Sequence, residues 1–233
     1  MDRAVAAYRR VVALAPTAQA LDALARLYME RGEPTEAVKW LVQSLESATA
    51  EDKPSIYLRL AQAHLADENP EEAIGALEQA QQEQATNTEI RDLLIELYRK
   101  AASWERLADL LTTSLPEIAD EDTIVAHARE AAQIYNERLK TPEKAVPALE
   151  KALALVPGDR TMQMQLATGL RVIERYEDAR GILEEIIKSF GRRRSAERAA
   201  AHVELANVAK AEGNMDEAFE QLDVASKMAV GNA

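Results

Sequence analysis

Apolar residues recur along this chain at three- and four-residue steps, which is the spacing of one face of an α-helix. The stretch 141–158, TPEKAVPALEKALALVPG, gives the clearest case. Its apolar face consists of Ala145, Leu149, Ala152 and Val156. Thr141 is a residue type that caps helix N-termini, Pro142 suits the first turn, and Gly158 follows the last apolar position. The pattern predicts one capped helix, kinked at Pro147 because an interior proline removes a backbone hydrogen bond.

The same small–large–small pattern returns six more times along the chain. The first residues of successive sets are 33, 36, 34, 38, 34 and 39 residues apart. The other six sets are Ala4, Tyr8 and Val11; Ala37, Leu41 and Ser44; Ala73, Leu77 and Ala80; Leu107, Leu111 and Ser114; Ala179, Leu183 and Ile186; and Ala218, Leu222 and Ala225. Every set after the first is preceded by a second helical pattern, such as Leu24, Ala25 and Tyr28. The chain therefore has two helices per unit of about 34 residues. Thirteen helices are expected, with the apolar sets forming one continuous core.

This period and pairing resemble the tetratricopeptide repeat (TPR) family over essentially the full length of the chain. The resemblance implies an all-α solenoid, a right-handed superhelix of antiparallel helix pairs like that of long bacterial TPR arrays. The expected organisation is a single solenoid over 1–233, with a leading half-repeat and six repeats of helices A and B. The half-repeat covers 1–16, and the repeats cover 17–53, 54–87, 88–120, 121–158, 159–193 and 194–233. The third repeat of this series carries the bulky residues Ile95 and Leu107 where the family has small ones, so its two helices are expected to splay.

Turn residues support this helix count. Pro116 is expected to end the helix that begins near Trp104, with the acidic stretch 117–122 as a solvated turn. Gly32 and Gly213 stand where an A helix has to stop. The expected N-terminal caps are Asn69, Thr141, Asp159, Ser195 and Asn214.

Charge and composition narrow the function. The formal net charge is −12 and the estimated pI is about 4.9, which disfavours a general nucleic-acid surface because phosphate contacts need clustered Lys and Arg. No apolar run approaches the roughly 20 residues of a membrane helix. We expect a cytoplasmic protein, with an extracytoplasmic location left open because the chain has no cysteine to decide it.

Residues for catalysis or metal binding do not come together in the sequence. The three histidines, His64, His127 and His202, lie in different repeats, and His64 is interpreted as a packed, hydrogen-bonded core residue. There is no cysteine, no G-x-S-x-G motif and no glycine-rich phosphate loop. The sequence therefore predicts a noncatalytic protein without metal or cofactor.

The resemblance to TPR proteins implies that the A helices line the concave face of the superhelix. Transferring the family's inward positions gives a polar row that an extended peptide could follow. The expected peptide-binding residues are Arg26, Arg59, Gln62, Glu96, Arg129, Gln133 and Asn207. For any one of them, an ordinary solvated helix face is the simpler interpretation. The two-carboxylate clamp of chaperone-binding TPR domains is not matched, since Asp22, Leu58 and Asp92 stand where a lysine would.

One basic cluster, Lys188 with Arg192, Arg193 and Arg194, lies on an expected inter-repeat turn. A solvated turn explains it more simply than a contact for an acidic partner, a lipid headgroup or RNA.

The favoured function is a scaffold or adaptor that binds a protein or peptide segment in the concave groove. Two alternatives stay open: a regulatory or targeting module of a larger protein that has its enzymatic domain elsewhere, and an RNA-processing helical-repeat protein. The apolar residues Phe219 and Leu222, and the lack of a polar capping helix before Gly231–Ala233, suggest an excerpt of a longer array. They also leave end-to-end self-association open.

Overall fold

The computed structural model describes residues 1–229, and the expected end at Gly231–Ala233 lies outside them. Over the described residues every regular element is helical: thirteen α-helices, two 3₁₀ segments and one π segment. The all-α class and the helix count predicted from the sequence are thereby confirmed. The chain divides into two compact units, Met1–Ser103 and Trp104–Ala233, which we describe separately.

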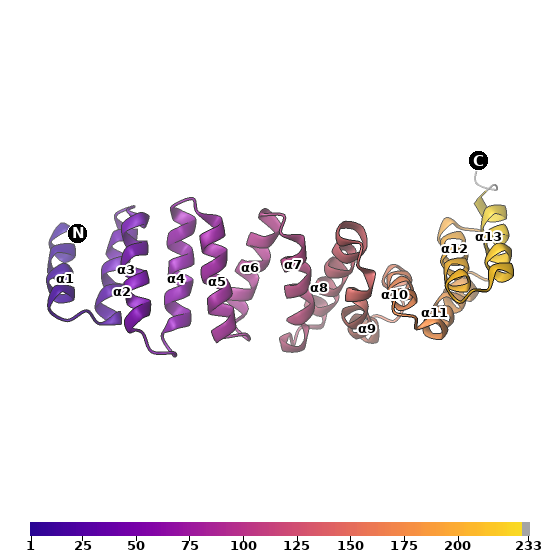
Figure 1. The fold of residues 1–233 in the computed structure, drawn as a ribbon, viewed down its shortest axis with the longest axis horizontal. Helices are drawn as coiled ribbons and strands as arrows, with labels where there is room; N and C mark the ends of the chain where they lie inside the picture. Colours follow the sequence, from indigo (N-terminus) through magenta and orange to yellow (C-terminus); the bar gives the residue numbers. More distant parts are fainter. Residues whose placement is uncertain (230–233) are drawn as a thin grey trace. The chain divides into compact units, whose positions relative to one another are not determined.

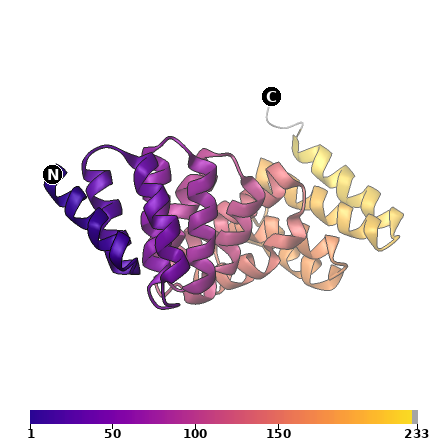
Figure 2. The same cartoon turned by 60° about the vertical axis from the view of Figure 1, so that its left-hand side comes forward.

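The first unit is a row of antiparallel helices in which each helix packs against the next (Figures 1 and 2). Helix α1 corresponds to the predicted leading B helix, and the pairs α2–α3 and α4–α5 correspond to the first two predicted A–B repeats. Helix α6 is the A helix of the following repeat. The bounds are α1 (Asp2–Leu14), α2 (Ala18–Glu30), α3 (Pro34–Ser47), α4 (Lys53–Ala66), α5 (Pro70–Glu83) and α6 (Thr88–Lys100).

The second unit starts with the B helix of that same repeat and continues with three more pairs (Figure 1). Its bounds are α7 (Trp104–Thr113), η1 (Leu115–Glu117), α8 (Glu121–Gln133), η2 (Ile134–Leu139), η3 (Pro142–Ala145), α9 (Val146–Leu155), α10 (Arg160–Val172), α11 (Tyr176–Ser189), α12 (Ala196–Ala211) and α13 (Met215–Ala229). The boundary between the units thus falls between α6 and α7, in the repeat with Ile95 and Leu107. That the two helices of this repeat splay stays a prediction.

The core is built by the repeated small and large residues, as expected for the five inner B helices. Leu149 and Ala152 on α9 and Ala145 at the end of η3 are completely buried, and so are the first two residues of the equivalent sets on α5, α7 and α11. The A helices contribute the matching face, for example Leu24 and Ala25 on α2. Small residues let the helix backbones approach, and the large side chain beside them fills the remaining space.

The sequence prediction was wrong for the terminal B helices, where the set does not form the core. On α1, Tyr8 and Val11 are exposed, and the helix buries Val5 and Val12 instead. On α13, Leu222 is exposed although Ala218 and Ala225 are buried. A B helix has one face toward its own A helix and another toward the next repeat. On α1 and α13, the apolar set is partly exposed because the described residues provide only one of these two neighbours.

The helix expected over 141–158 is divided between Ala145 and Val146, just before Pro147. Pro142–Ala145 form a 3₁₀ turn, and the α-helix begins only at Val146, so that the proline lies in its first turn, where no backbone donor is needed. Helix α10 packs closely against this turn at Gly169. A Cβ atom added there would lie 2.7 Å from Val146 Cγ2 and 2.8 Å from the carbonyl oxygen of Pro142. The glycine therefore allows a backbone approach that no other residue would.

Three of the five expected caps form, and two do not. The side chains of Asp159, Ser195 and Asn214 each accept a backbone N–H bond in the first turn that follows. Asn69 instead donates to Asp67 Oδ2 at 3.0 Å, and Thr141 Oγ1 is buried without a hydrogen-bond partner. Both precede a helix that begins with proline, and the backbone of both departs from the extended conformation seen at the working caps Asp159 and Ser195.

The turns end helices largely as the sequence predicts. Gly32 and Gly213 have positive φ angles of 73° and 85°, a conformation in which glycine carries no steric penalty. Helix α7 ends at Thr113, three residues before Pro116. The stretch 117–122 is not one solvated turn, because Ile118 is buried and the α8 helix begins at Glu121.

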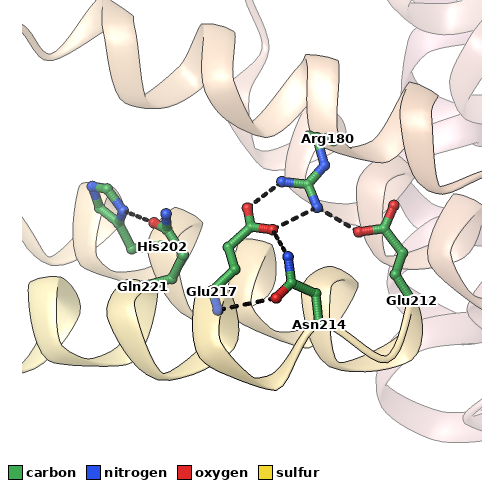
Figure 3. A network of polar contacts seen from close by, with 6 residues as sticks. All are labelled: Arg180, His202, Glu212, Asn214, Glu217 and Gln221. Atoms are coloured by element: carbon green, nitrogen blue, oxygen red, sulfur yellow. Dashed lines mark hydrogen bonds and ion pairs between the residues drawn. The ribbon is translucent and has the colours of Figure 1, made fainter.

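An arginine clamp joins the last repeat to the one before it (Figure 3). Arg180 on α11 forms a two-pronged ion pair with Glu217 on α13 and a further ion pair with Glu212, in the turn between α12 and α13. Asn214 caps α13 beside this clamp and also donates to Glu217 at 2.9 Å. The carboxylates raise the pKa of Arg180 further above its usual value, through the hydrogen bond to Glu217 first. Arg180 is half-buried and contacts two carboxylates at once, so the clamp restrains the position of the α12–α13 turn.

Candidate functional site

A pocket of about 250 Å³ opens between the A helices α2 and α4 of the first unit. Its floor is apolar and its rim is polar. The floor consists of Ala25, Met29 and Leu41, and the rim of Arg26, Glu30, Arg59 and Gln62. Ala25 and Leu41 are both almost completely buried, so the floor of the pocket belongs to the core of the first unit. Three residues predicted from the sequence, Arg26, Arg59 and Gln62, are therefore brought together at one place.

A buried carboxylate holds the two arginines of the rim. Asp22 on α2 lies 2.9 Å from Arg26 Nη2 and 2.5 Å from Arg59 Nε, and its side chain is only 11% exposed. Arg59 also donates to Ser55 Oγ at 3.2 Å. Each guanidinium has five N–H donors, so these contacts leave donors for a ligand while the arginines stay in place. With Glu30 on the rim and Asp22 behind it, the formal charges at the pocket balance to zero.

A smaller hollow of about 60 Å³ adjoins the pocket on the other side of Arg59. It lies toward the N-terminal ends of α2 and α4 and is lined by Ala18, Gln19, Asp22, Asp52, Ser55, Ile56 and Arg59. Arg59 therefore borders two hollows that follow one another along the same pair of helices, and an extended chain lying there would pass across its guanidinium.

The other four predicted residues do not line this pocket; three of them contact a neighbour on their own helix or turn, and Arg129 contacts the residue before α10. Glu96 pairs with Lys100 along α6 at 2.6 Å, and the hydrogen bond from Lys100 lowers the pKa of Glu96. Arg129 pairs with Asp159 at 2.8 Å. Gln133 donates to Glu137 at 3.1 Å and Asn207 donates to Glu204 at 2.9 Å. That these four residues contact a bound peptide stays a prediction.

The second unit has its own hollows, which the sequence analysis did not find. Two pockets of about 310 and 280 Å³ share Arg160 and Ile186. The guanidinium of Arg160 lies over the ring of buried Phe190 at 4.5 Å and is 3.7 Å from Glu197. Gln165, in the wall of the larger pocket, has a buried Oε1 without a hydrogen-bond partner. Phe190 lies within the predicted basic turn and is buried, whereas Lys188 and Arg192–Arg194 are exposed.

Matches to protein-family models identify the family of this chain. Two models described as tetratricopeptide repeat match residues 20–55, and 42–88 with 164–229, which is together more than half of the chain. The chain belongs to the TPR family. TPR proteins bind protein partners, and such repeat arrays are typically noncatalytic scaffolds. The first pocket lies within the matched residues, between two TPR A helices.

Solved TPR structures resemble the chain at low sequence identity. MamA (41-end) from Desulfovibrio magneticus RS-1 is 15% identical over 78% of this chain and 97% of its own, with a TM-score of 0.48. YrrB, described as a TPR protein with an unusual peptide-binding site, is 15% identical over 81% and 91%, with a TM-score of 0.48. A putative kinesin light chain with TPR-like repeats from Podospora anserina is 22% identical over 91% and 95%, with a TM-score of 0.42. No curated protein matches the sequence.

The acidic residues, the histidines and the apolar character of the helices bear on other kinds of site. Over residues 1–229 no three His, Cys, Asp or Glu side chains gather as they would around a metal ion. His202 Nδ1 lies 2.7 Å from Gln221 Oε1 (Figure 3), but Nδ1 of His64 is buried without a partner, contrary to the hydrogen-bonded residue that was expected. None of the described helices is long and apolar enough to cross a membrane.

Proposed function

We propose that this TPR scaffold binds an extended segment of a protein partner across α2 and α4, with one apolar side chain of the segment in the α2–α4 pocket. The observation that carries the proposal is the meeting of Arg26, Arg59 and Gln62 around an apolar floor. Their N–H groups are suited to the carbonyl oxygens of an extended main chain, which has no internal partners for them. Of the seven residues expected from the sequence, we propose these three as the primary contacts, with Glu96, Arg129, Gln133 and Asn207 as further contacts.

The balance of charge favours an apolar anchor over an acidic one. Asp22 already neutralises one arginine, and Glu30 on the rim would repel a carboxylate. An aliphatic or aromatic side chain instead covers the exposed surface of Met29 and gains from its removal from water. We expect micromolar affinity, because an open pocket of this size buries little of a peptide and the peptide loses conformational freedom.

The test begins with selection of binders from a random library of nine-residue peptides on the purified chain. The selected peptides, labelled with fluorescein, are then titrated by fluorescence polarisation. Met29→Glu places a charge on the floor, and Arg59→Ala removes donors from the rim. Each is expected to weaken binding at least tenfold, about 1.4 kcal/mol, with the helix content unchanged by circular dichroism.

Matched controls separate the candidate sites. Met164 lines the larger pocket of the second unit, so Met164→Glu is the same change in the other hollow. The triple change of Arg192, Arg193 and Arg194 to Ala tests the basic turn. Both controls should bind like the unchanged chain. If one of them loses affinity while Met29→Glu keeps it, the peptide binds elsewhere and the proposal is wrong.

A further inference from the structure

Helix α1 has an apolar stripe that no element of its unit covers. The helix packs on α2 through Val5 and Val12. Beside this buried face, Tyr8, Val11 and Leu14 follow one another at three-residue steps, and Val11 is 49% and Leu14 88% exposed. Figure 1 shows α1 at the edge of the first unit, with α2 as its neighbour.

Helix α13 has a second stripe of this kind. It packs on α12 through Ala218 and Ala225. Its exposed apolar residues are Met215, Phe219 and Leu222, at steps of four and three, which places them on one face. Phe219 is 64% exposed. Exposed apolar residues scattered singly are normal, but three in a row on a helix face mark an interaction surface.

The charges beside the two stripes are opposite. Arg3 and Arg10 border the stripe of α1, and Asp216 and Glu220 border that of α13. All four are exposed, and no ion pair forms at any of them in the described part of the chain. On α1, the acidic Asp2 is already held by Arg31 at 3.1 Å. The α1 surface is thus basic around its apolar centre, and the α13 surface is acidic.

We infer that α1 of one copy packs on α13 of a second copy in a head-to-tail contact. The apolar stripes form the centre of the contact, and Arg3 and Arg10 face Asp216 and Glu220 at its border. Contacts of α1 with α1, or of α13 with α13, would bring like charges together, which disfavours them. Because each copy has one surface of each kind, the contact is heterologous and continues from copy to copy unless it closes. The inference uses none of the residues of the α2–α4 pocket, so either can fail without the other.

Charge reversal tests the contact. In Arg3→Glu/Arg10→Glu both surfaces are acidic, and in Asp216→Lys/Glu220→Lys both are basic. Sedimentation velocity of the unchanged chain at low salt is expected to show a weight-average coefficient that rises with concentration. Each double variant alone should need at least a tenfold higher concentration for the same rise, and a 1:1 mixture of the two should recover it, because each then offers the other an opposite charge.

Two control variants reverse exposed charges away from α1 and the exposed face of α13. Glu71→Lys/Glu72→Lys reverses two exposed acids in the first turn of α5, and Arg192→Glu/Arg193→Glu reverses two exposed arginines; both should associate like the unchanged chain. Phe219→Ser should weaken association without loss of helix content. An unchanged chain that stays monomeric to millimolar concentration, double variants that associate normally, or a mixture that stays dissociated would each overturn the inference.

Discussion

Gly169 offers the sharpest test of the packing in the second unit. A methyl group added at this position would lie 2.7 Å from Val146 Cγ2 and 2.8 Å from the carbonyl oxygen of Pro142. The valine could rotate, but the carbonyl belongs to the backbone of the 3₁₀ turn, so α10 would have to move away from η3. Overpacking of this kind costs about 1–3 kcal/mol.

A second effect works in the opposite direction and has to be separated. Replacing glycine by alanine inside a helix stabilises it by roughly 1 kcal/mol, because glycine loses more backbone freedom on folding. Gly181 lies inside α11 of the same unit, and a Cβ atom there would have no neighbour within 4 Å. Gly181→Ala should therefore show the favourable effect alone. The difference between the two alanine variants is then the packing cost of about 1–3 kcal/mol.

Urea unfolding followed by tryptophan fluorescence would measure this difference. In a Trp40→Phe background the remaining tryptophan, Trp104, belongs to the second unit and reports on its unfolding. We expect Gly169→Ala to unfold at lower urea concentration than the parent and Gly181→Ala at the same or a higher one. Equal midpoints for the two variants would refute the close approach of α10 to the 3₁₀ turn.

Two further predictions concern the same unit. Leu149→Ala should lower the free energy of unfolding by about 2–5 kcal/mol, because the leucine is fully buried. The control Glu184→Ala changes an exposed residue and should cost under about 0.5 kcal/mol. Equal losses for the two variants in urea unfolding would contradict the assigned helix face. Arg180→Met should lower the free energy of unfolding by about 1–3 kcal/mol, because Glu212 and Glu217 lose their cation. Since salt screens this ion pair, the difference in melting temperature between the variant and the parent should shrink as the salt concentration rises.

Much of the fold followed from the sequence because packing within a repeat is local. The buried positions of η3 and α9 could be read from Ala145, Leu149 and Ala152, since the equivalent residues of the other inner B helices are buried as well. The break just before Pro147 was expected as a kink, because a proline has no N–H to donate. The exposed face of α1 could not be predicted in the same way, because its sequence repeats the pattern of the inner helices although Tyr8 and Val11 are exposed. On α13, the sequence already marked Phe219 and Leu222 as surplus apolar surface, and both are exposed.

The candidate pocket was predicted in part. The register of the repeats gave Arg26, Arg59 and Gln62, but not that Asp22 would hold both arginines. The spacing of Asp22 and Arg26, four residues apart on one helix, was a signal that could have indicated the pair. Met29 and Leu41 could not be found, because the floor depends on how three helices meet. The hollows around Arg160 were missed for the same reason.

The two proposed surfaces would reinforce one another without sharing a residue. A single open pocket binds a peptide weakly, because the apolar area it covers is small. Copies joined through α1 and α13 would carry one such pocket each, so a partner with several matching segments would bind its second pocket at a high effective concentration. Affinity for such a partner would then rise with the number of joined copies, although no individual contact became stronger. The charges that join the copies are exposed and therefore screened by salt, so this gain would be lost first at high ionic strength, while the affinity of a single segment for the largely apolar pocket would change little.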